Sequence, residues 1–438
     1  MESSAVPQAA QPWPDPAQRP LPGAAAAVPP ARPEVEGLKA YSAPLEGRRG
    51  LLRLDFNENT VGPSPKVVEA IRAIPPDHYA IYPEYDGLRE AVAASLVAAA
   101  SPGAVHPSPG VIVAAASLRT LGPGQVGLFN GVDAAIHAVF QAFGAPGDRL
   151  LTTSPTFGYY TPCAQMQGMA IEAIPYRLPD FAFPLEEIGA ALSGESAAAA
   201  GWCPPRLLLL CNPNNPTGTR LAPELILELA AAAPHTLVVV DELYEAFTGD
   251  SVLPLLLGGP ELPPTVSAAA PGGAPAHRDP FAAYPNLLVL RSLSKTAGIA
   301  GLRIGFAIGA AALVDRVSRV TGPYDINSFA VTAAFAALAD QPYVDAYVAE
   351  VLRGRDWLVE RLRSASVRHH VAGGNYLLIW PCRPADLVEA ELRTAGILVR
   401  SMAGKALIDG SLRVSLGTQE QMERFWAAYR QIDRRTTA

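Results

Sequence analysis

Short apolar runs alternate with amphipathic stretches of helix length through the middle of the chain. The runs RLLTTSP at 149–155 and RLLLLCN at 206–212 have the length of buried strands, and each is followed by a helix-length stretch. Such alternation predicts an α/β fold with a mostly parallel sheet covered on both faces. The predicted strands are 126–130, 149–155, 170–176, 206–212, 236–242, 286–290 and 303–306, and the predicted helices are 131–143, 157–167, 184–192 and 222–233.

A second, smaller sheet is predicted in the last quarter of the chain. In SLRVSLGT at 411–418 apolar and polar residues alternate, so Leu412 and Val414 face one side and Arg413 faces the other. Arg413 can therefore point away from the core. This part comprises predicted helices at 310–320, 328–363 and 418–434 and predicted strands at 374–381, 396–402 and 411–418.

The N-terminal region shows weaker patterning. Residues 1–38 are rich in Pro and Ala without periodicity, which predicts a disordered or loosely attached extension. The segment 51–65 predicts a short strand and a turn-rich loop, and helices are predicted at 66–74 and 88–100. Two further stretches, 101–125 and 249–284, are loop-like and are interpreted as insertions.

Composition narrows the class of protein. The chain has 438 residues, of which 49% are hydrophobic, but no run approaches the ~20 apolar residues of a membrane span. A net charge of -7 argues against nucleic acid as the main partner. The four cysteines lie far apart without metal-ligand spacing, and the N-terminus lacks a secretory signal pattern, so we expect a cytoplasmic protein without a metal site.

Lys295 is the first candidate for chemistry. It follows the predicted buried strand at 286–290 in a chain that has 34 basic residues but only four lysines. A solvated loop position is the ordinary fate of lysine. The alternative is an amine in a dry pocket, with its pKa lowered from about 10.4 so that it can attack a carbonyl carbon.

Four other polar motifs follow predicted strands, at the edge where open α/β sheets bind ligands. Gly131 and Asp133 open a helix, which suits an anion, although Asp133 could simply cap the helix. An aromatic run follows 149–155, and a rigid Asn-Pro turn with Asn215 follows 206–212. Asp241 ends an apolar strand, where an unpaired carboxylate is unfavourable. Each motif alone also has a purely structural interpretation.

Together, NNPTG (214–218), DELY (241–244) and SLSKTAGIAGLRIG (292–305) resemble the fold-type I pyridoxal phosphate enzymes of the aspartate aminotransferase superfamily. The wider arrangement, including LDFNEN at 54–59, YPEYDGLREA at 82–91 and LRVSLGT at 412–418, is similar to histidinol-phosphate aminotransferases of amino-acid biosynthesis. The resemblance covers about 38–435. It implies a large domain with a mostly parallel seven-stranded sheet, a smaller α+β domain, and pyridoxal 5′-phosphate as cofactor.

The resemblance also implies residue roles. Lys295 would bind the cofactor covalently and then move the substrate proton. Asp241 would pair with the ring nitrogen, Tyr244 and Asn215 would hold the phenolic oxygen, and Phe157 would stack on the ring. The expected phosphate ligands are Gly131, Val132, Asp133, Ser292, Ser294, Arg303 and, from the second subunit of a homodimer, Tyr82.

For the substrate, the resemblance makes Arg413 the α-carboxylate clamp. Arg400 and Tyr41 are the candidates for the phosphate of the substrate, with Asn57 lining the same mouth of the site and Asn215 as a further substrate-binding residue. The implied domains are a segment at 39–85 that contributes to the small domain and to dimer contacts, a large domain at 86–322, and a small domain at 323–438. Ala134, where the family commonly has an acidic residue, and the insertions depart from the pattern.

The sequence leaves three kinds of alternative function open. SLSK also satisfies the S-x-x-K motif of penicillin-binding acyltransferases, but no S-D-N or K-T-G element accompanies it. A ligand sensor without turnover would carry a DNA-binding extension that 1–38 does not resemble. Among pyridoxal phosphate enzymes, an aromatic amino-acid aminotransferase or a threonine-phosphate decarboxylase-like enzyme would use a similar scaffold.

Overall fold

The protein is described by a computed structural model over residues 28–38, 46–100, 119–194, 203–258 and 279–434. Its centre is a seven-stranded sheet of order β2-β8-β7-β6-β5-β3-β4. All neighbours are parallel except β8, which runs antiparallel to β2 and β7. The predicted mostly parallel sheet is confirmed. Its strands are β2 (Val126–Phe129), β3 (Arg149–Ser154), β4 (Ala170–Pro175), β5 (Leu207–Cys211), β6 (Leu237–Asp241), β7 (Leu287–Ser292) and β8 (Gly305–Gly309).

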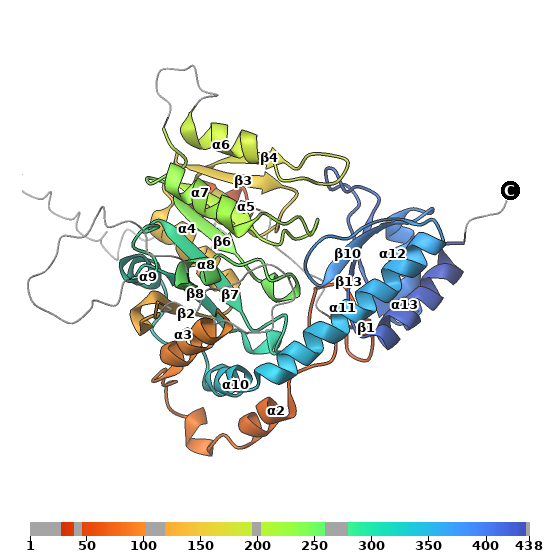
Figure 1. Cartoon of the computed structure of the whole chain (residues 1–438), viewed down its shortest axis with the longest axis horizontal. Helices are drawn as coiled ribbons and strands as arrows, with labels where there is room; N and C mark the ends of the chain where they lie inside the picture. Colours follow the sequence, from red (N-terminus) through yellow and green to blue (C-terminus); the bar gives the residue numbers. More distant parts are fainter. Residues whose placement is uncertain (1–27, 39–45, 101–118, 195–202, 259–278, 435–438) are drawn as a thin grey trace, which may run out of the picture.

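Both faces of this sheet are covered by helices, which explains the continuous apolar runs in the sequence. In β5, Leu207 and Leu209 pack into one apolar layer, and Leu208 and Leu210 pack into the opposite layer. The first layer is closed by α4 (Val132–Phe143), α5 (Tyr160–Met166) and α9 (Ala311–Ser318). The second is closed by α3 (Leu88–Ala99), α6 (Leu185–Ser193), α7 (Pro223–Ala232) and α8 (Leu253–Gly258) (Figure 1).

The predicted second sheet is also present, as four antiparallel strands in the order β12-β13-β10-β9. The segment 396–402, predicted as one strand, is divided because its two halves pair with different partners. Ile397 and Leu398 pair with a strand near the N-terminus, whereas Arg400 and Ser401 pair with β13. The elements are β1 (Leu52–Arg53), β9 (Arg368–His370), β10 (Tyr376–Trp380), β11 (Ile397–Leu398), β12 (Arg400–Ser401), β13 (Leu412–Ser415), α12 (Ala385–Thr394) and α13 (Gln419–Ile432).

The single helix predicted at 328–363 is wrong. The structure has α10 (Ser328–Leu338) and α11 (Gln341–Ser364), with Pro342 in the first turn of α11. Proline lacks the N–H that would bond to Leu338 and clashes with that carbonyl, so a continuous helix cannot pass through this point. α10 packs against α2 (Pro65–Arg72) and α3, whereas α11 continues toward the small sheet (Figure 1).

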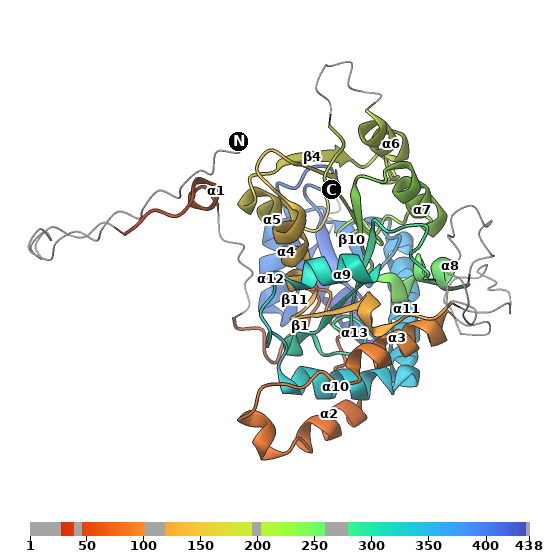
Figure 2. The same ribbon diagram turned by 90° about the vertical axis from the view of Figure 1, so that its left-hand side faces the viewer.

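The N-terminal extension contains one helical turn. Residues 33–36 form α1 (Pro33–Glu36), beside α5 in Figure 2, and the guanidinium of Arg32 donates to the carbonyl oxygen of Met166 at 2.5 Å. Most of the extension and of the two insertions lies outside the described residues. Within the described ranges, no helix combines the length and apolar character that a bilayer crossing requires.

Candidate active site

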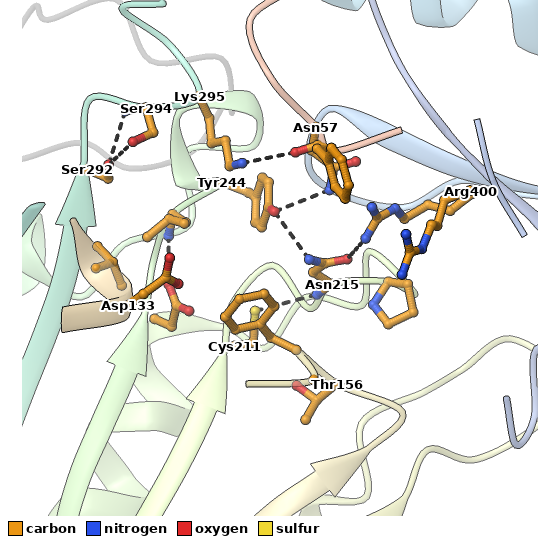
Figure 3. Close-up of a pocket in the computed structure, with 18 of the residues that line it drawn as sticks. Asn57, Asp133, Thr156, Cys211, Asn215, Tyr244, Ser292, Ser294, Lys295 and Arg400 are labelled. Carbon is orange, nitrogen blue, oxygen red and sulfur yellow. Dashed lines mark hydrogen bonds between the residues drawn. The ribbon is translucent and has the colours of Figure 1, made fainter. Parts of the chain in front are cut away.

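A cavity of about 310 Å³ lies where the carboxyl ends of β5 and β6 and the loop after β7 face the small sheet (Figure 3). Its lining includes side chains from strand ends that are far apart in the sequence, together with Arg400 and Arg413 from β12 and β13. A cavity of this size, lined by converging polar groups, is typical of a small-molecule site.

Lys295 extends into this cavity from a tight loop. Ser292 ends β7, donates from its hydroxyl to Ser294 Oγ at 2.8 Å and accepts from the backbone N–H of Ser294 at 3.0 Å. The Lys295 amine donates to the carbonyl oxygen of Phe56 at 3.0 Å. Burial and the nearby charge of Arg413 lower the pKa of Lys295 to about 8. A much larger fraction of this amine than of an ordinary lysine is therefore unprotonated near neutral pH, as a nucleophile requires.

Asp241 ends β6 and is 2% exposed. Its Oδ2 accepts from the hydroxyl of Tyr160 at 2.7 Å, and its Oδ1 accepts from the backbone N–H of Leu243 at 3.2 Å. Burial raises the pKa of Asp241 to about 6, although both hydrogen bonds act in the opposite direction. A cationic group in the cavity would hold this carboxylate ionised.

Tyr244 lies between two amides. Its hydroxyl oxygen accepts from Asn57 Nδ2 and from Asn215 Nδ2, both at 3.2 Å. Burial raises the pKa of Tyr244 far above its ordinary value, so the hydroxyl stays protonated. A tyrosine that accepts twice can still donate its own hydrogen to a bound oxygen.

Arg413 points away from the buried residues Leu412 and Val414, as the alternation predicted. Its guanidinium donates to Asn215 Oδ1 and to the carbonyl oxygen of Asp55, both at 2.6 Å. Arg400 is its direct cross-strand neighbour, with its guanidinium 5.7 Å from the ring centre of Phe56. Two guanidinium groups therefore line the same side of the cavity.

The start of α4 provides an anion cradle. Gly131 has φ of +79°, and a Cβ atom there would lie 2.5 Å from the guanidinium of Arg303, so the position requires glycine. Arg303 donates to the carboxylate of Asp133 at 2.8 Å. Val132 and Asp133 form the first turn of α4, whose N–H groups lack helical partners. Val132, Asp133, Ser292, Ser294 and Arg303 all line the cavity.

The remaining predicted site residues are placed differently. Phe157 lines the cavity and meets Tyr160 edge to face at 5.5 Å. Asn57 also lines the cavity. It is only 1% exposed, and its Nδ2 donates to the hydroxyl oxygen of Tyr244, so it lies inside the site and not at the mouth. Tyr82 is 71% exposed, is stacked on Tyr324 at 4.0 Å and does not line the cavity. Tyr41 lies outside the described residues.

Several contributors were not anticipated from the sequence. Tyr160 lies in the aromatic run after β3, where only Phe157 was considered, yet Tyr160 holds Asp241. Lys405, one of the four lysines, lines the cavity with Met402 and Ile408, and its rarity was a signal that could have identified it. The carbonyl group of Phe56 leaves no sequence signal, because every residue has one.

The donor set fits pyridoxal 5′-phosphate. The cavity offers an amine of lowered pKa, a buried carboxylate, a protonated phenol and a cradle of backbone N–H groups, hydroxyls and a guanidinium. These match the carbonyl carbon, the ring nitrogen, the ring oxygen and the phosphate of that cofactor. Among the described residues, no cluster of His, Cys, Asp and Glu side chains is arranged to hold a metal ion.

Comparison with known proteins gives a consistent result. A family model for aminotransferase class I and II matches residues 49–428. The histidinol-phosphate aminotransferase of Roseiflexus castenholzii is 31% identical over 414 residues, covering 89% of this chain and 94% of that protein.

Two solved structures share the fold. The histidinol-phosphate aminotransferase from Sinorhizobium meliloti, crystallised with pyridoxal 5′-phosphate, superimposes with a TM-score of 0.72 at 22% identity, covering 93% of this chain and 99% of that one. The L-threonine-O-3-phosphate decarboxylase from Porphyromonas gingivalis gives a TM-score of 0.64 at 21% identity, covering 87% and 99%. At these identities the two structures support the fold alone.

Proposed function

Because the chain belongs to the aminotransferase class I and II family, we propose that it is a cytoplasmic, pyridoxal phosphate-dependent histidinol-phosphate transaminase. The reaction would exchange the amino group between L-histidinol phosphate and 2-oxoglutarate, giving imidazole-acetol phosphate and L-glutamate. The observation that carries the chemistry is the shared cavity of Lys295 and Asp241, with pKa values of about 8 and about 6. The proposed substrate rests on the similarity to the relatives and on the two guanidinium groups of Arg400 and Arg413, which lie side by side on adjacent strands.

When bound, pyridoxal 5′-phosphate supplies an electrophilic carbon and a ring that withdraws electrons. Lys295 would hold the cofactor at that carbon, with loss of water, and once the substrate amine has displaced it, its Nζ would accept the proton of the substrate α-carbon, whose electron pair the cofactor ring would take up. Asp241, held by Tyr160, would keep the ring nitrogen protonated. Tyr244 and Asn215 would hold the ring oxygen, and Phe157 would cover the face of the ring.

Substrate binding would use the small sheet. The forked guanidinium of Arg413 matches the α-carboxylate of glutamate with two parallel hydrogen bonds. In histidinol phosphate, a phosphate ester takes the place of the α-carboxylate. The phosphate has more negative charge than the carboxylate and lies farther from the α-carbon. Arg400 lies on the neighbouring strand and lines the same cavity, so it is the cation that would meet the additional charge.

The exposed aromatic surface supports a homodimer. Tyr79, Tyr82 and Tyr324 are 62%, 71% and 54% exposed, and Tyr82 is stacked on Tyr324. Large exposed apolar side chains that gather together are typical of protein interfaces. In the proposed dimer, Tyr82 of one subunit would reach the cofactor phosphate of the other.

A donor panel tests the proposed function. Holoenzyme is incubated with 2-oxoglutarate and, separately, with histidinol phosphate, phenylalanine, tyrosine or threonine phosphate, and the products are identified. We expect glutamate to form fastest from histidinol phosphate. Phenylalanine as the better donor would indicate an aromatic aminotransferase, and carbon dioxide release from threonine phosphate would indicate a decarboxylase.

A further inference from the structure

Three consecutive residues hold three different side chains of the site. We call residues 55–58 the N-terminal strip. Its contacts are Asp55 O with Arg413 Nη2 at 2.6 Å, Phe56 O with Lys295 Nζ at 3.0 Å, and Asn57 Nδ2 with Tyr244 Oη at 3.2 Å. Two of these contacts use backbone carbonyl oxygens, so the strip acts through its position and not through the identity of those side chains.

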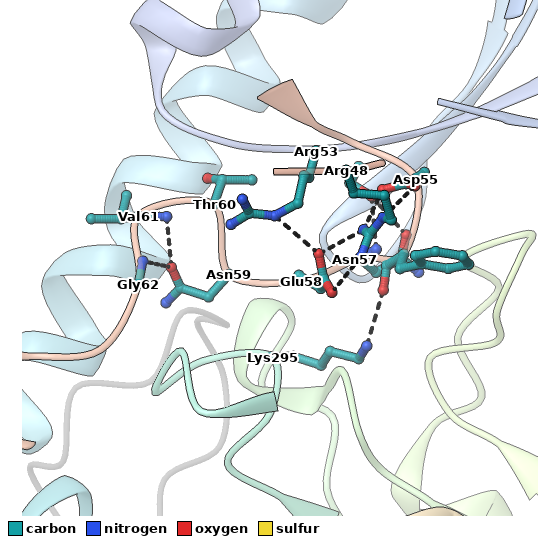
Figure 4. A network of polar contacts seen from close by, with 12 residues as sticks. Arg48, Arg53, Asp55, Asn57, Glu58, Asn59, Thr60, Val61, Gly62 and Lys295 are labelled. Carbon is teal, nitrogen blue, oxygen red and sulfur yellow. Dashed lines mark hydrogen bonds and ion pairs between the residues drawn. The ribbon is translucent and has the colours of Figure 1, made fainter. Parts of the chain in front are cut away.

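Arg48 contacts this strip from the side away from the cavity (Figure 4). Its guanidinium donates to both oxygens of Asp55, at 2.7 and 3.0 Å, and to both oxygens of Glu58, at 2.8 and 3.1 Å. The same group lies over the ring of Phe56, 4.4 Å from its centre. Arg48 is 9% exposed and does not line the cavity. One side chain therefore contacts three of the four residues of the strip.

The chain beyond the strip follows the loop of Lys295. Asn59 Nδ2 donates to the carbonyl oxygen of Thr296 at 2.8 Å. A Cβ atom on Gly298 would lie 2.4 Å from the backbone of Gly62, so the two segments touch backbone to backbone. A displacement of the strip would therefore also displace the loop that carries Lys295.

We propose that Arg48 is a positioning residue of the active site, which fixes the N-terminal strip and through it the places of Lys295, Arg413 and Tyr244. This inference rests on the proposed function only for the roles of those three residues. Paired hydrogen bonds between a guanidinium and two carboxylates are among the most directional contacts in proteins, which suits such a task. Because a misplacement of about 1 Å can lower turnover by about 100-fold, a distant clamp can matter for rate.

Arg48 also affects the charges that face Lys295. Arg413 and Arg303 lower the pKa of Lys295, and Glu58 and Asp133 raise it. The Asp241 carboxylate also interacts electrostatically with the amine, and the ring of Tyr244 lies 6.0 Å from it. The negative charge of Glu58 is compensated by the guanidinium of Arg48. Together with Arg53, Arg48 keeps the pKa of Glu58 below its ordinary value, although burial acts in the opposite direction. Removing Arg48 would leave the negative charge of Glu58 to act on the Lys295 nitrogen.

The test compares Arg48→Ala with Arg49→Ala, an adjacent and exposed arginine that serves as the matched control. Each variant is purified as holoenzyme, and the visible absorbance of the bound cofactor is titrated with pH alongside steady-state kinetics. For Arg48→Ala we expect a higher pH midpoint and a fall in kcat/KM of up to about 100-fold. Arg49→Ala should retain both values of the wild type.

A second variant keeps the test decisive if Arg48→Ala folds poorly. Glu58→Gln removes the negative charge that Arg48 contacts. Because that charge raises the pKa of Lys295, the absorbance midpoint of Glu58→Gln should move to lower pH, opposite to that of Arg48→Ala. A role in stability alone would move neither midpoint. Folded Arg48→Ala with the midpoint and kcat/KM of Arg49→Ala would overturn the proposal, as would Glu58→Gln with an unchanged midpoint. Failure of the wild type in the donor panel would overturn the proposed function alone, because the absorbance titration needs no substrate.

Discussion

The two sides of the cavity are built in different ways. The sheet side consists of short loops at the ends of β2, β5, β6 and β7, and each loop is anchored by a strand that is buried on both faces. The opposite side combines the N-terminal strip with β12 and β13, whose contacts join residues more than 350 positions apart, such as Asn57 and Ser415. The sheet side thus places its loops by the ends of buried strands, although Lys295 is also held by Phe56 O, whereas the opposite side is assembled by long-range contacts.

This difference matches a division of labour. The sheet side carries Lys295, Asp241 and the anion cradle, which in the proposed function would hold the cofactor whatever the substrate. The opposite side carries Arg413, Arg400 and Lys405, which in the proposed function would contact the part in which substrates differ. Variants of the two sides should therefore separate an effect on chemistry from an effect on substrate choice.

The largest effect is expected on the sheet side. Lys295→Ala removes the only proposed covalent attachment and proton carrier, so turnover should fall by at least about a thousandfold and the visible absorbance of bound cofactor should disappear. Steady-state assays and absorbance spectra measure both. Lys66→Ala, which alters an exposed lysine paired with Asp340 at 2.7 Å, is the matched control. A Lys295→Ala protein with normal spectrum and rate would refute the site.

A smaller and more selective effect is expected on the opposite side. Arg413→Ala removes a charged two-pronged donor, so the KM values for glutamate and 2-oxoglutarate should both rise by about 10- to 100-fold. Arg400→Ala, on the neighbouring strand, should affect histidinol phosphate far more than glutamate. Steady-state kinetics with each substrate measure the difference. If Arg400→Ala lowered kcat/KM equally for histidinol phosphate and glutamate, Arg400 would not be the residue that binds the phosphate.

The smallest effect concerns stability, and its direction follows from Asp241. Burial raises the pKa of this group in the folded chain to about 6, above the value of about 3.9 for an unfolded aspartate. The cofactor-free folded protein thus binds a proton that the unfolded chain has released, and its stability falls as pH rises between about 4 and 6. Asp241→Asn should raise the free energy of unfolding at pH 8 by about 1–3 kcal/mol.

Denaturant unfolding of cofactor-free protein at pH 8 and at pH 4 measures this effect. The advantage of Asp241→Asn should vanish at pH 4, where wild-type Asp241 is protonated in the folded state. Equal stability of the two proteins at pH 8 would mean that Tyr160 compensates the buried charge completely.

The central strands of the sheet, such as β5 and β6, were predictable because they are continuous apolar runs, a signal that depends on local sequence only. The break between α10 and α11 follows from Pro342, which is a local signal, whereas the errors in the strands arose where tertiary pairing decides. Strand β9, with the sequence Arg-His-His, has no apolar pattern and forms only because β10 offers it an edge. The segment 396–402 has one strand pattern but pairs with two different strands.

The same distinction holds for the site. The motifs at strand ends do gather around one cavity, since parallel strands end at the same edge of a sheet. The contact of Tyr160 with Asp241 could not be predicted, because the aromatic run after β3 does not indicate which of its rings meets the carboxylate. The contact of Arg48 with the strip could not be predicted either, because nothing in the local sequence indicates which carboxylates that arginine meets. Contacts made by a backbone carbonyl, as at Phe56, are invisible in any sequence.

The close approach of Gly298 to Gly62 has a practical consequence for enzyme engineering. A methyl group on Gly298 would collide with the backbone of Gly62, so a substitution at Gly298 would disturb the loop of the amine together with the chain beyond the strip. Attempts to broaden the range of accepted donors should instead begin at Met402, Lys405 and Ile408, which line the cavity without contacting that junction. The molecule thus separates positions that a library can vary from positions that it should leave intact.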